Sequence, residues 1–154
     1  MNALGDLYQE VILDHNRQPR NFHAIEGAVR KAEGHNPLCG DRVTVYVDLE
    51  GNRLRDISFV GSGCAISKAS ASMMTEALKG KTRAEAEALF QVFHRLLTGD
   101  GPRGARPETP AADLGKLVVF SGVREFPVRV KCATLPWHTM RAALQGIEET
   151  ASTE

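Results

Sequence analysis

CGDRVTVYVDLEGNRLRDISFVGSGC, residues 39–64, predicts a β-hairpin with a cysteine at each end. Apolar and polar residues alternate over Val43–Leu49, which is the period of a half-buried strand. The Glu-Gly-Asn that follows is typical of a tight turn, and Leu54–Val60 predicts the returning strand. Because the two ends of a hairpin are neighbours, we expect the sulfurs of Cys39 and Cys64 to arrive at one edge of the sheet.

Outward from the hairpin, apolar residues at helical spacing predict helices on both sides. The last of these helices contains Pro136, so it either kinks or begins at that residue. The predicted helices cover Leu4–Ile12, Ile66–Ala77, Ala86–Leu97, Asp113–Phe120 and Pro127–Ile147. The other predicted features are a short edge strand at Ala28–Glu33, a turn at Gly34–Pro37, a capping box at Thr82–Glu85 and an exposed loop at Thr98–Pro110.

Length and composition describe a chain of ordinary domain size. Its 154 residues are enough to bury a core, and we expect residues 1–154 to form one domain. The 19 basic and 19 acidic residues balance, so we expect neither a nucleic-acid partner nor an anionic membrane surface. The first residues have no signal-peptide pattern and no apolar run is long enough to span a bilayer. We therefore expect a cytoplasmic protein.

The three cysteines are the residues with the most chemical content. They are Cys39, Cys64 and Cys132, and in a reducing compartment sparse cysteines indicate a metal or catalytic site rather than disulfides. Cys64 precedes a predicted helix, whose dipole favours a thiolate, and Lys131 can do the same for Cys132. With the carboxylate of Asp41 the three thiols make a four-ligand set for a soft metal such as zinc or iron.

Simpler interpretations exist for each of these residues. A free cysteine often packs as a small apolar residue, and this applies most to Cys132, whose helix has a core face. The simpler interpretation of Asp41 is a turn residue, and that of Lys131 is a solvated cation. His35 is a weak ligand candidate, because a lone histidine in a loop is more often exposed. His94 and His138 are expected at the surface or between helices, and the pair Met73 and Met74 in the core.

Three further motifs follow one another along the chain, at Asn36–Arg42, Gly61–Met74 and Phe126–Leu135. In this order they resemble the U-type iron–sulfur cluster assembly family, which includes IscU and the NifU N-terminal domain, and most closely its SufU branch. Where IscU-type proteins usually have a histidine before the last cysteine, this chain has Lys131. Their chaperone-binding Leu-Pro-Pro-Val-Lys motif is replaced here by Glu125–Arg129. These departures favour SufU.

The resemblance implies an α+β fold with a small, mainly antiparallel three-stranded sheet packed against about five helices. It implies that Cys39, Asp41, Cys64 and Cys132 are the metal ligands, holding zinc or a transient [2Fe–2S] cluster. It also implies a pyridoxal-phosphate cysteine desulfurase as sulfur donor, and downstream iron–sulfur assembly or acceptor proteins as recipients.

By the same analogy Cys39 accepts the persulfide, and Arg129 and Lys131 assist the transfer or dock the sulfur donor. Two functions use the same residues: a scaffold on which a cluster is built, and a zinc-dependent sulfurtransferase that carries sulfur onward. The alternative from another class is a structural zinc module without sulfur chemistry. The missing fourth cysteine or histidine and the carboxylate in the ligand set disfavour that alternative.

Overall fold

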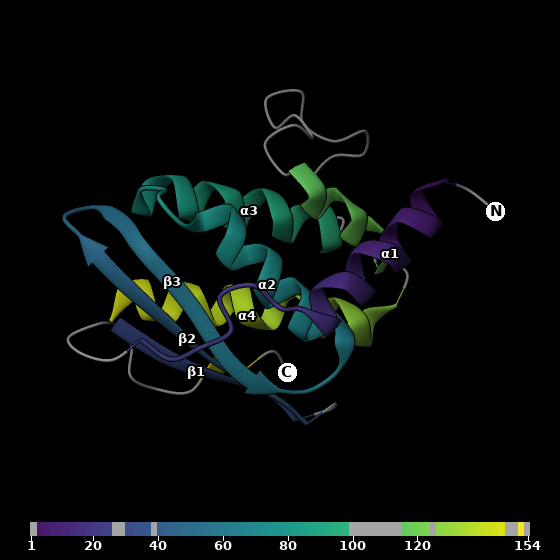
Figure 1. The fold of residues 1–154 in the computed structure, drawn as a ribbon, viewed down its shortest axis with the longest axis horizontal. Coiled ribbons are helices and arrows are strands. Elements are labelled where there is room, and N and C mark those ends of the chain that lie inside the picture. The colour runs from purple at the N-terminus through teal and green to yellow at the C-terminus, as the bar shows by residue number, and fades with distance from the viewer. Residues whose placement is uncertain are drawn as a thin grey trace.

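A computed structural model describes residues 3–25, 30–37, 40–98, 115–123, 126–146 and 151–152. Helices and strands alternate in blocks along this part of the chain (Figure 1). In chain order the elements are α1 (Ala3–Arg17), β1 (Arg30–Asn36), β2 (Asp41–Glu50), β3 (Arg53–Ser62), α2 (Ala65–Leu78), α3 (Arg83–Thr98), the 3-10 helix η2 (Gly115–Val123), α4 (Pro127–Gln145) and β4 (Ala151–Ser152).

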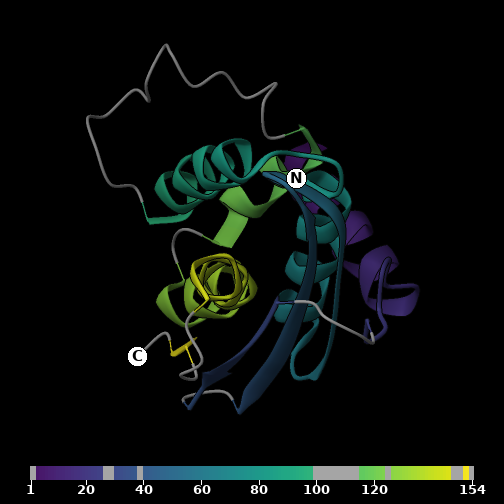
Figure 2. The ribbon, with the colours of Figure 1, turned by 90° about the vertical axis from the view of Figure 1, so that its left-hand side faces the viewer.

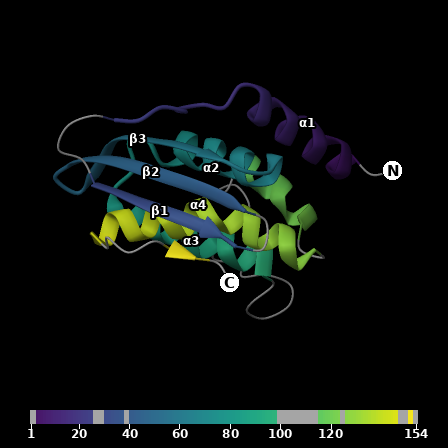
Figure 3. The same ribbon diagram turned by 90° about the horizontal axis from the view of Figure 1, so that it is seen from below.

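The sheet is built on the predicted hairpin. β2 and β3 pair in antiparallel fashion around a two-residue turn, in which Gly51 has a positive φ of 63°. β1 adds to the other side of β2, also antiparallel, and the two-residue β4 pairs parallel with β1, giving the order β3-β2-β1-β4 (Figure 3). The prediction of three main antiparallel strands in an α+β fold is therefore confirmed, with a short fourth strand added.

The prediction for the first strand was wrong in its position. The Gly34–Pro37 segment was predicted as a turn, but β1 runs through Gly34 and ends at Asn36. Gly34 serves close packing instead: a Cβ at this position would lie 2.0 Å from Thr139 Oγ1 of α4. A glycine in a strand can thus mark the approach of another element rather than a turn.

The helices pack with the sheet around one apolar core. α4 contacts β1 and β2, α2 contacts β3, and the two helices contact each other, while α1 packs on α2. Figure 2 shows α4 nearly end-on beside the strands. The alternate residues Val43, Val45 and Val47 of β2 are buried, as the period of two requires.

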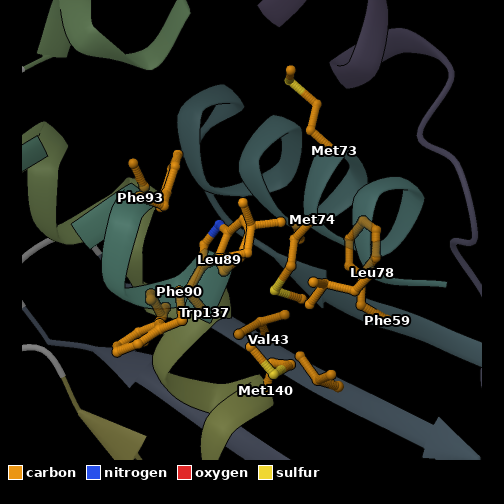
Figure 4. Packing of buried hydrophobic residues seen from close by; sticks show 14 of the residues in the cluster. Val43, Phe59, Met73, Met74, Leu78, Leu89, Phe90, Phe93, Trp137 and Met140 are labelled. Atoms are coloured by element: carbon orange, nitrogen blue, oxygen red, sulfur yellow. The ribbon is translucent and has the colours of Figure 1, made fainter. Parts of the chain in front are cut away.

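The centre of the core lies where α2, α3 and α4 meet (Figure 4). Trp137 is fully buried, stacks on Phe93 at 4.6 Å between ring centroids, and donates its indole N–H to Ser70 Oγ at 3.2 Å. Met73 and Met74 of α2 are buried in this cluster, which confirms that they are core residues.

The helix predictions hold except in number. The capping box is formed, with Thr82 N–H donating to Glu85 Oε1 at 2.9 Å and Glu85 N–H donating to Thr82 Oγ1 at 3.1 Å. α4 begins with Pro127 in its first turn and continues through Pro136. The described residues contain four α-helices rather than about five, because the segment predicted to end at Phe120 forms η2 instead.

Several predicted features lie outside the described residues. They are Cys39, most of the loop at residues 98–110, Asp113 and the last stripe residue, Ile147. Within the part of the chain that is described, none of the helices has the length and apolar character needed to cross a membrane.

Candidate metal centre

Cys64 lies at the junction of the hairpin with α2. It is the N-cap residue of this helix, and the Ser67 backbone N–H donates to its Sγ at 3.4 Å. The thiol therefore replaces the usual hydroxyl or carboxylate of an N-cap. A sulfur in this position faces the positive end of the helix dipole, as the sequence predicted, and the charge of a thiolate is favoured there.

Asp41 is the first residue of β2, and its side chain is fully buried. Its Oδ1 accepts the backbone N–H of Cys64 at 2.8 Å, and its Oδ2 lies 3.6 Å from Cys64 Sγ. The hairpin register pairs Arg42 with Ser62, which brings the two ends of the hairpin together as predicted. Asp41 is thus a buried acceptor at the site rather than an exposed turn residue.

Gly63 leaves the space that this carboxylate fills. A Cβ on Gly63 would lie 2.3 Å from Asp41 Oδ1, and Gly63 has a φ of 153°. Any larger residue here would displace the carboxylate or the backbone that carries Cys64. The Gly-Ser-Gly before Cys64 therefore has a packing role at the site.

Cys132 enters the site from the second turn of α4 and is only 2% exposed. One carboxylate oxygen of Asp41 and the sulfurs of Cys64 and Cys132 all lie within 4.8 Å of one another. Two sulfurs bound to one tetrahedral zinc ion are about 3.8 Å apart, for Zn–S bonds of about 2.3 Å. The group therefore has a size and a donor set that are compatible with a soft metal ion, and the sulfur of Cys132 lies with the other two candidate ligand atoms.

The Cys64 thiol is acidic in this arrangement. Its pKa is lowered to about 7, first by a hydrogen bond with the Cys132 thiol and then by the backbone N–H groups of Ser67 and Ile66. Burial and the negative charge of Asp41 act in the opposite direction. A large share of Cys64 is therefore thiolate near neutral pH, the form that binds metals and attacks sulfur.

Asn36 is a member of the site that sequence reasoning missed. It is fully buried at the end of β1, and its Nδ2 lies 3.8 Å from Cys132 Sγ. It was missed because residues 34–37 were predicted to form a turn. The available signal was the alternation of Ala32, Gly34 and Asn36, which places all three on the inner face of one strand.

The other candidates are distributed around the site. Arg129 is exposed and lies over the ring of Phe126 at 4.7 Å, and Lys131 is half-buried beside Cys132. His35 lies on the outer face of β1, paired in register with Arg42 and outside the group of convergent ligand atoms. Cys39 falls in the pair of residues 38–39, outside the described part of the chain.

His94 and His138 face each other between α3 and α4, with 5.6 Å between ring centroids. Both rings also pack on Phe90. This confirms the predicted interhelix position, and it separates the two histidines from the thiol group.

Comparison with known proteins identifies the family. The NifU-like N-terminal domain matches residues 7–133. The chain belongs to this family. It is 37% identical over 146 residues to the iron–sulfur cluster assembly scaffold protein IscU of Streptococcus pyogenes, covering 94% of this chain and 87% of that protein. It is 39% identical over 137 residues to the zinc-dependent sulfurtransferase SufU of Bacillus subtilis, covering 89% and 88% respectively.

Solved structures agree with the family at the level of the fold. The SUF-system protein FiSufU from Fervidobacterium islandicum AW-1 superposes with a TM-score of 0.81 at 36% identity, covering 90% of this chain and 97% of that one. The N-terminal part of a NifU-like protein from Brucella abortus gives 0.78 at 25% identity, with coverages of 95% and 97%. Both of these chains thus share the fold described above.

Proposed function

We propose that this protein accepts sulfur from a pyridoxal-phosphate cysteine desulfurase at a zinc centre and passes it on for iron–sulfur cluster assembly. The observation that carries the proposal is the convergence of Asp41, Cys64 and Cys132, whose ligand atoms lie within 4.8 Å of one another. Cys39 completes the ligand set. The names of the similar IscU and SufU proteins support a role in cluster assembly, and the SufU name supports zinc.

Zinc, when bound, keeps its thiolates deprotonated and holds their segments together. The chain supplies the rest of the site. Asp41 fixes the start of α2 through the Cys64 N–H, and Cys132 is anchored in a buried helix. A carboxylate is a harder ligand than a thiolate, so Asp41 is the ligand that this set gives up most easily.

The transfer step is an exchange between sulfurs. The Cys39 thiolate attacks the outer sulfur of the persulfide on the desulfurase cysteine. A sulfur–sulfur bond forms at Cys39, the original sulfur–sulfur bond breaks, and the desulfurase cysteine leaves as a thiolate. The proton of the outer sulfur stays with it, so no external oxidant or reductant is consumed. Arg129 and Lys131, near the start of α4, assist or dock the donor.

The test combines the zinc-loaded protein with a purified cysteine desulfurase and free cysteine. Turnover is followed together with mass spectrometry of the thiol that gains sulfur. We expect faster turnover and a persulfide on Cys39, and we expect Cys39→Ala to lose both while still binding zinc through the three remaining ligands. A Cys39→Ala protein that accelerates the desulfurase like the parent would contradict the assignment of Cys39.

Two other outcomes assign the remaining functions. If zinc blocks transfer and only the iron-supplied protein develops a cluster chromophore, the protein is a scaffold and zinc is a substitute. If neither form accepts sulfur while zinc binding raises the melting temperature, the site is a structural zinc module.

A further inference from the structure

Asn36 connects three parts of the candidate metal centre. Its side chain reaches Cys132, with Nδ2 at 3.8 Å from Sγ. Its backbone carbonyl accepts the Gly40 N–H at 2.8 Å, which closes the turn that leads to Asp41. In the sheet it is paired in register with Asp41 itself. Both side chains are fully buried. Asn36 therefore lies between the start of β2 and the thiol of α4.

The chemistry of the contact determines its direction. A metal-bound cysteine is a thiolate, which has no proton and can only accept a hydrogen bond. The amide of Asn36 is neutral at every pH at which the protein folds, and its NH₂ group supplies the donor. An N–H group directed at a thiolate draws charge from the sulfur. Because the hydrogen bond is donated to the sulfur, it lowers the nucleophilicity of the thiolate. Like the outer-shell partners of other metal ligands, it also orients the ligand.

The two described thiols differ in access. Cys64 is half-buried, with Asp41 beside it, whereas Cys132 is only 2% exposed. A thiolate that must meet a sulfur donor has to be reachable. A thiolate that must keep the metal in place during exchange is better buried and less nucleophilic.

We infer that Asn36 is the positioning residue that makes Cys132 the stationary ligand of the metal centre. Its amide N–H holds the Cys132 thiolate on the metal while sulfur exchange takes place at Cys39, the acceptor proposed above. This inference rests on the proposed function, because it presupposes that the site binds a metal.

The experiment uses Asn36→Leu, an apolar residue of similar size that removes the donor, and Asn36→Ala as a smaller second variant. Thr139→Val is the matched control. Thr139 is also fully buried, and its hydroxyl donates to the Leu135 carbonyl within α4, next to β1. The control therefore removes a buried hydrogen bond from α4, the helix that contains Cys132, and leaves the Asn36 donor to sulfur in place.

Three measurements are made on each full-length protein. Cobalt(II) is loaded as a spectroscopic substitute for zinc, and the sulfur-to-cobalt charge-transfer band is recorded. Zinc affinity is measured by competition with a chromophoric chelator. Zinc-loaded protein is then treated with iodoacetamide, and alkylation of each cysteine is mapped by mass spectrometry.

For Asn36→Leu and Asn36→Ala we expect the band to move to longer wavelength, because a sulfur without its hydrogen bond is easier to oxidise. We expect zinc affinity to fall about 10- to 100-fold, the usual effect of losing an outer-shell partner. Alkylation of Cys132 should increase relative to Cys64. Thr139→Val should match the parent in all three measurements.

An unchanged band and a zinc affinity within about twofold of the parent in both Asn36 variants would overturn the inference, since outer-shell losses usually cost far more. If Asn36→Leu does not fold, the Asn36→Ala protein decides on the same measurements. Failure of the metal centre itself is a different result: the parent protein would then bind neither cobalt nor zinc. Failure of sulfur transfer is different again: the parent would bind both metals but accept no sulfur from the desulfurase.

Discussion

Cys64 combines a helix N-cap, a neighbouring thiol and a neighbouring carboxylate in one position. The first two lower its pKa and the third raises it, and the outcome is a pKa of about 7. Because the hydrogen bond with Cys132 is the largest of these effects, the acidity of Cys64 depends on a residue far away in the sequence.

We expect Cys132→Ala to raise the pKa of Cys64 in the metal-free protein, because the main group that stabilises the thiolate is lost. Asp41→Asn should lower the pKa of Cys64 further, because it removes a negative charge beside the thiolate. The measurement is the rate of iodoacetamide alkylation at Cys64 over a pH series, read by mass spectrometry. Identical midpoints in the parent and both variants would show that neither neighbour controls this thiol.

Gly63 provides a second prediction at the residue scale. A methyl group here would meet Asp41 Oδ1 at 2.3 Å, so we expect Gly63→Ala to displace the carboxylate and to weaken zinc binding about tenfold or more. Zinc affinity is measured by chelator competition. Gly51→Ala is the control: Gly51 also has a positive φ, but open space surrounds it at the far end of the hairpin. Equal zinc affinities in the two variants would contradict the packing role of Gly63.

Among the elements, α4 has the largest part in building the site. It crosses β1 and β2 and carries Cys132 to the ends of the hairpin. Pro136 lies within it, and Ser70 of α2 donates its hydroxyl to the Ala133 carbonyl at 2.5 Å, so α2 supplies a hydrogen bond close to the proline. The helix that Cys64 caps and the helix that contains Cys132 are thus hydrogen-bonded to each other.

The close approach of α4 to β1 depends on Gly34. We expect Gly34→Ala to destabilise the protein by about 1–3 kcal/mol, because its Cβ would overlap Thr139 Oγ1. Thr139→Ala removes that oxygen, so the cost of Gly34→Ala should be smaller in the Thr139→Ala background. Urea denaturation of the parent, both single variants and the double variant gives the coupling between the two sites. Additive changes would show that the contact does not limit the approach of α4.

For the whole molecule, the histidine pair between α3 and α4 sets part of the pH dependence of stability. The pKa of His138 is lowered to about 4, first by burial and then by the positive charges of His94 and Arg141. Arg141 in turn pairs with Glu87 of α3 at 3.2 Å, and Phe90 contacts both histidine rings. The folded protein therefore keeps His138 neutral where the unfolded chain would protonate it.

The direction of this pH dependence follows from the protons that the folded and unfolded states bind. Between the ordinary histidine pKa of about 6.5 and about 4, the unfolded state binds more protons at this residue, so the free energy of unfolding falls as the pH falls. Above that range His138 is neutral in both states and contributes no dependence. We expect His138→Gln to flatten this decline, as measured by urea denaturation over the same range. His23→Gln, at an exposed histidine, should leave the profile unchanged, and an unaltered slope in His138→Gln would exclude His138 as its source.

The sequence by itself determined the features that depend on near neighbours in the chain. Alternation and a tight turn defined the hairpin, at whose ends Asp41 lies beside Cys64. The pattern around Thr82 and Glu85 defined the start of α3. These predictions held because the periodicity and the turn chemistry each lie within a few residues.

Only the tertiary structure decided which distant residues complete the site. The sequence proposed that Cys132 joins it but left core packing as an equal possibility, and it read Gly34 and Asn36 as parts of a turn. All three depend on where α4 crosses the sheet: Cys132 lies on that helix, Gly34 admits it, and Asn36 donates to it. The position of one element against another is fixed by complementary surfaces of segments about a hundred residues apart, and local patterns do not contain that information.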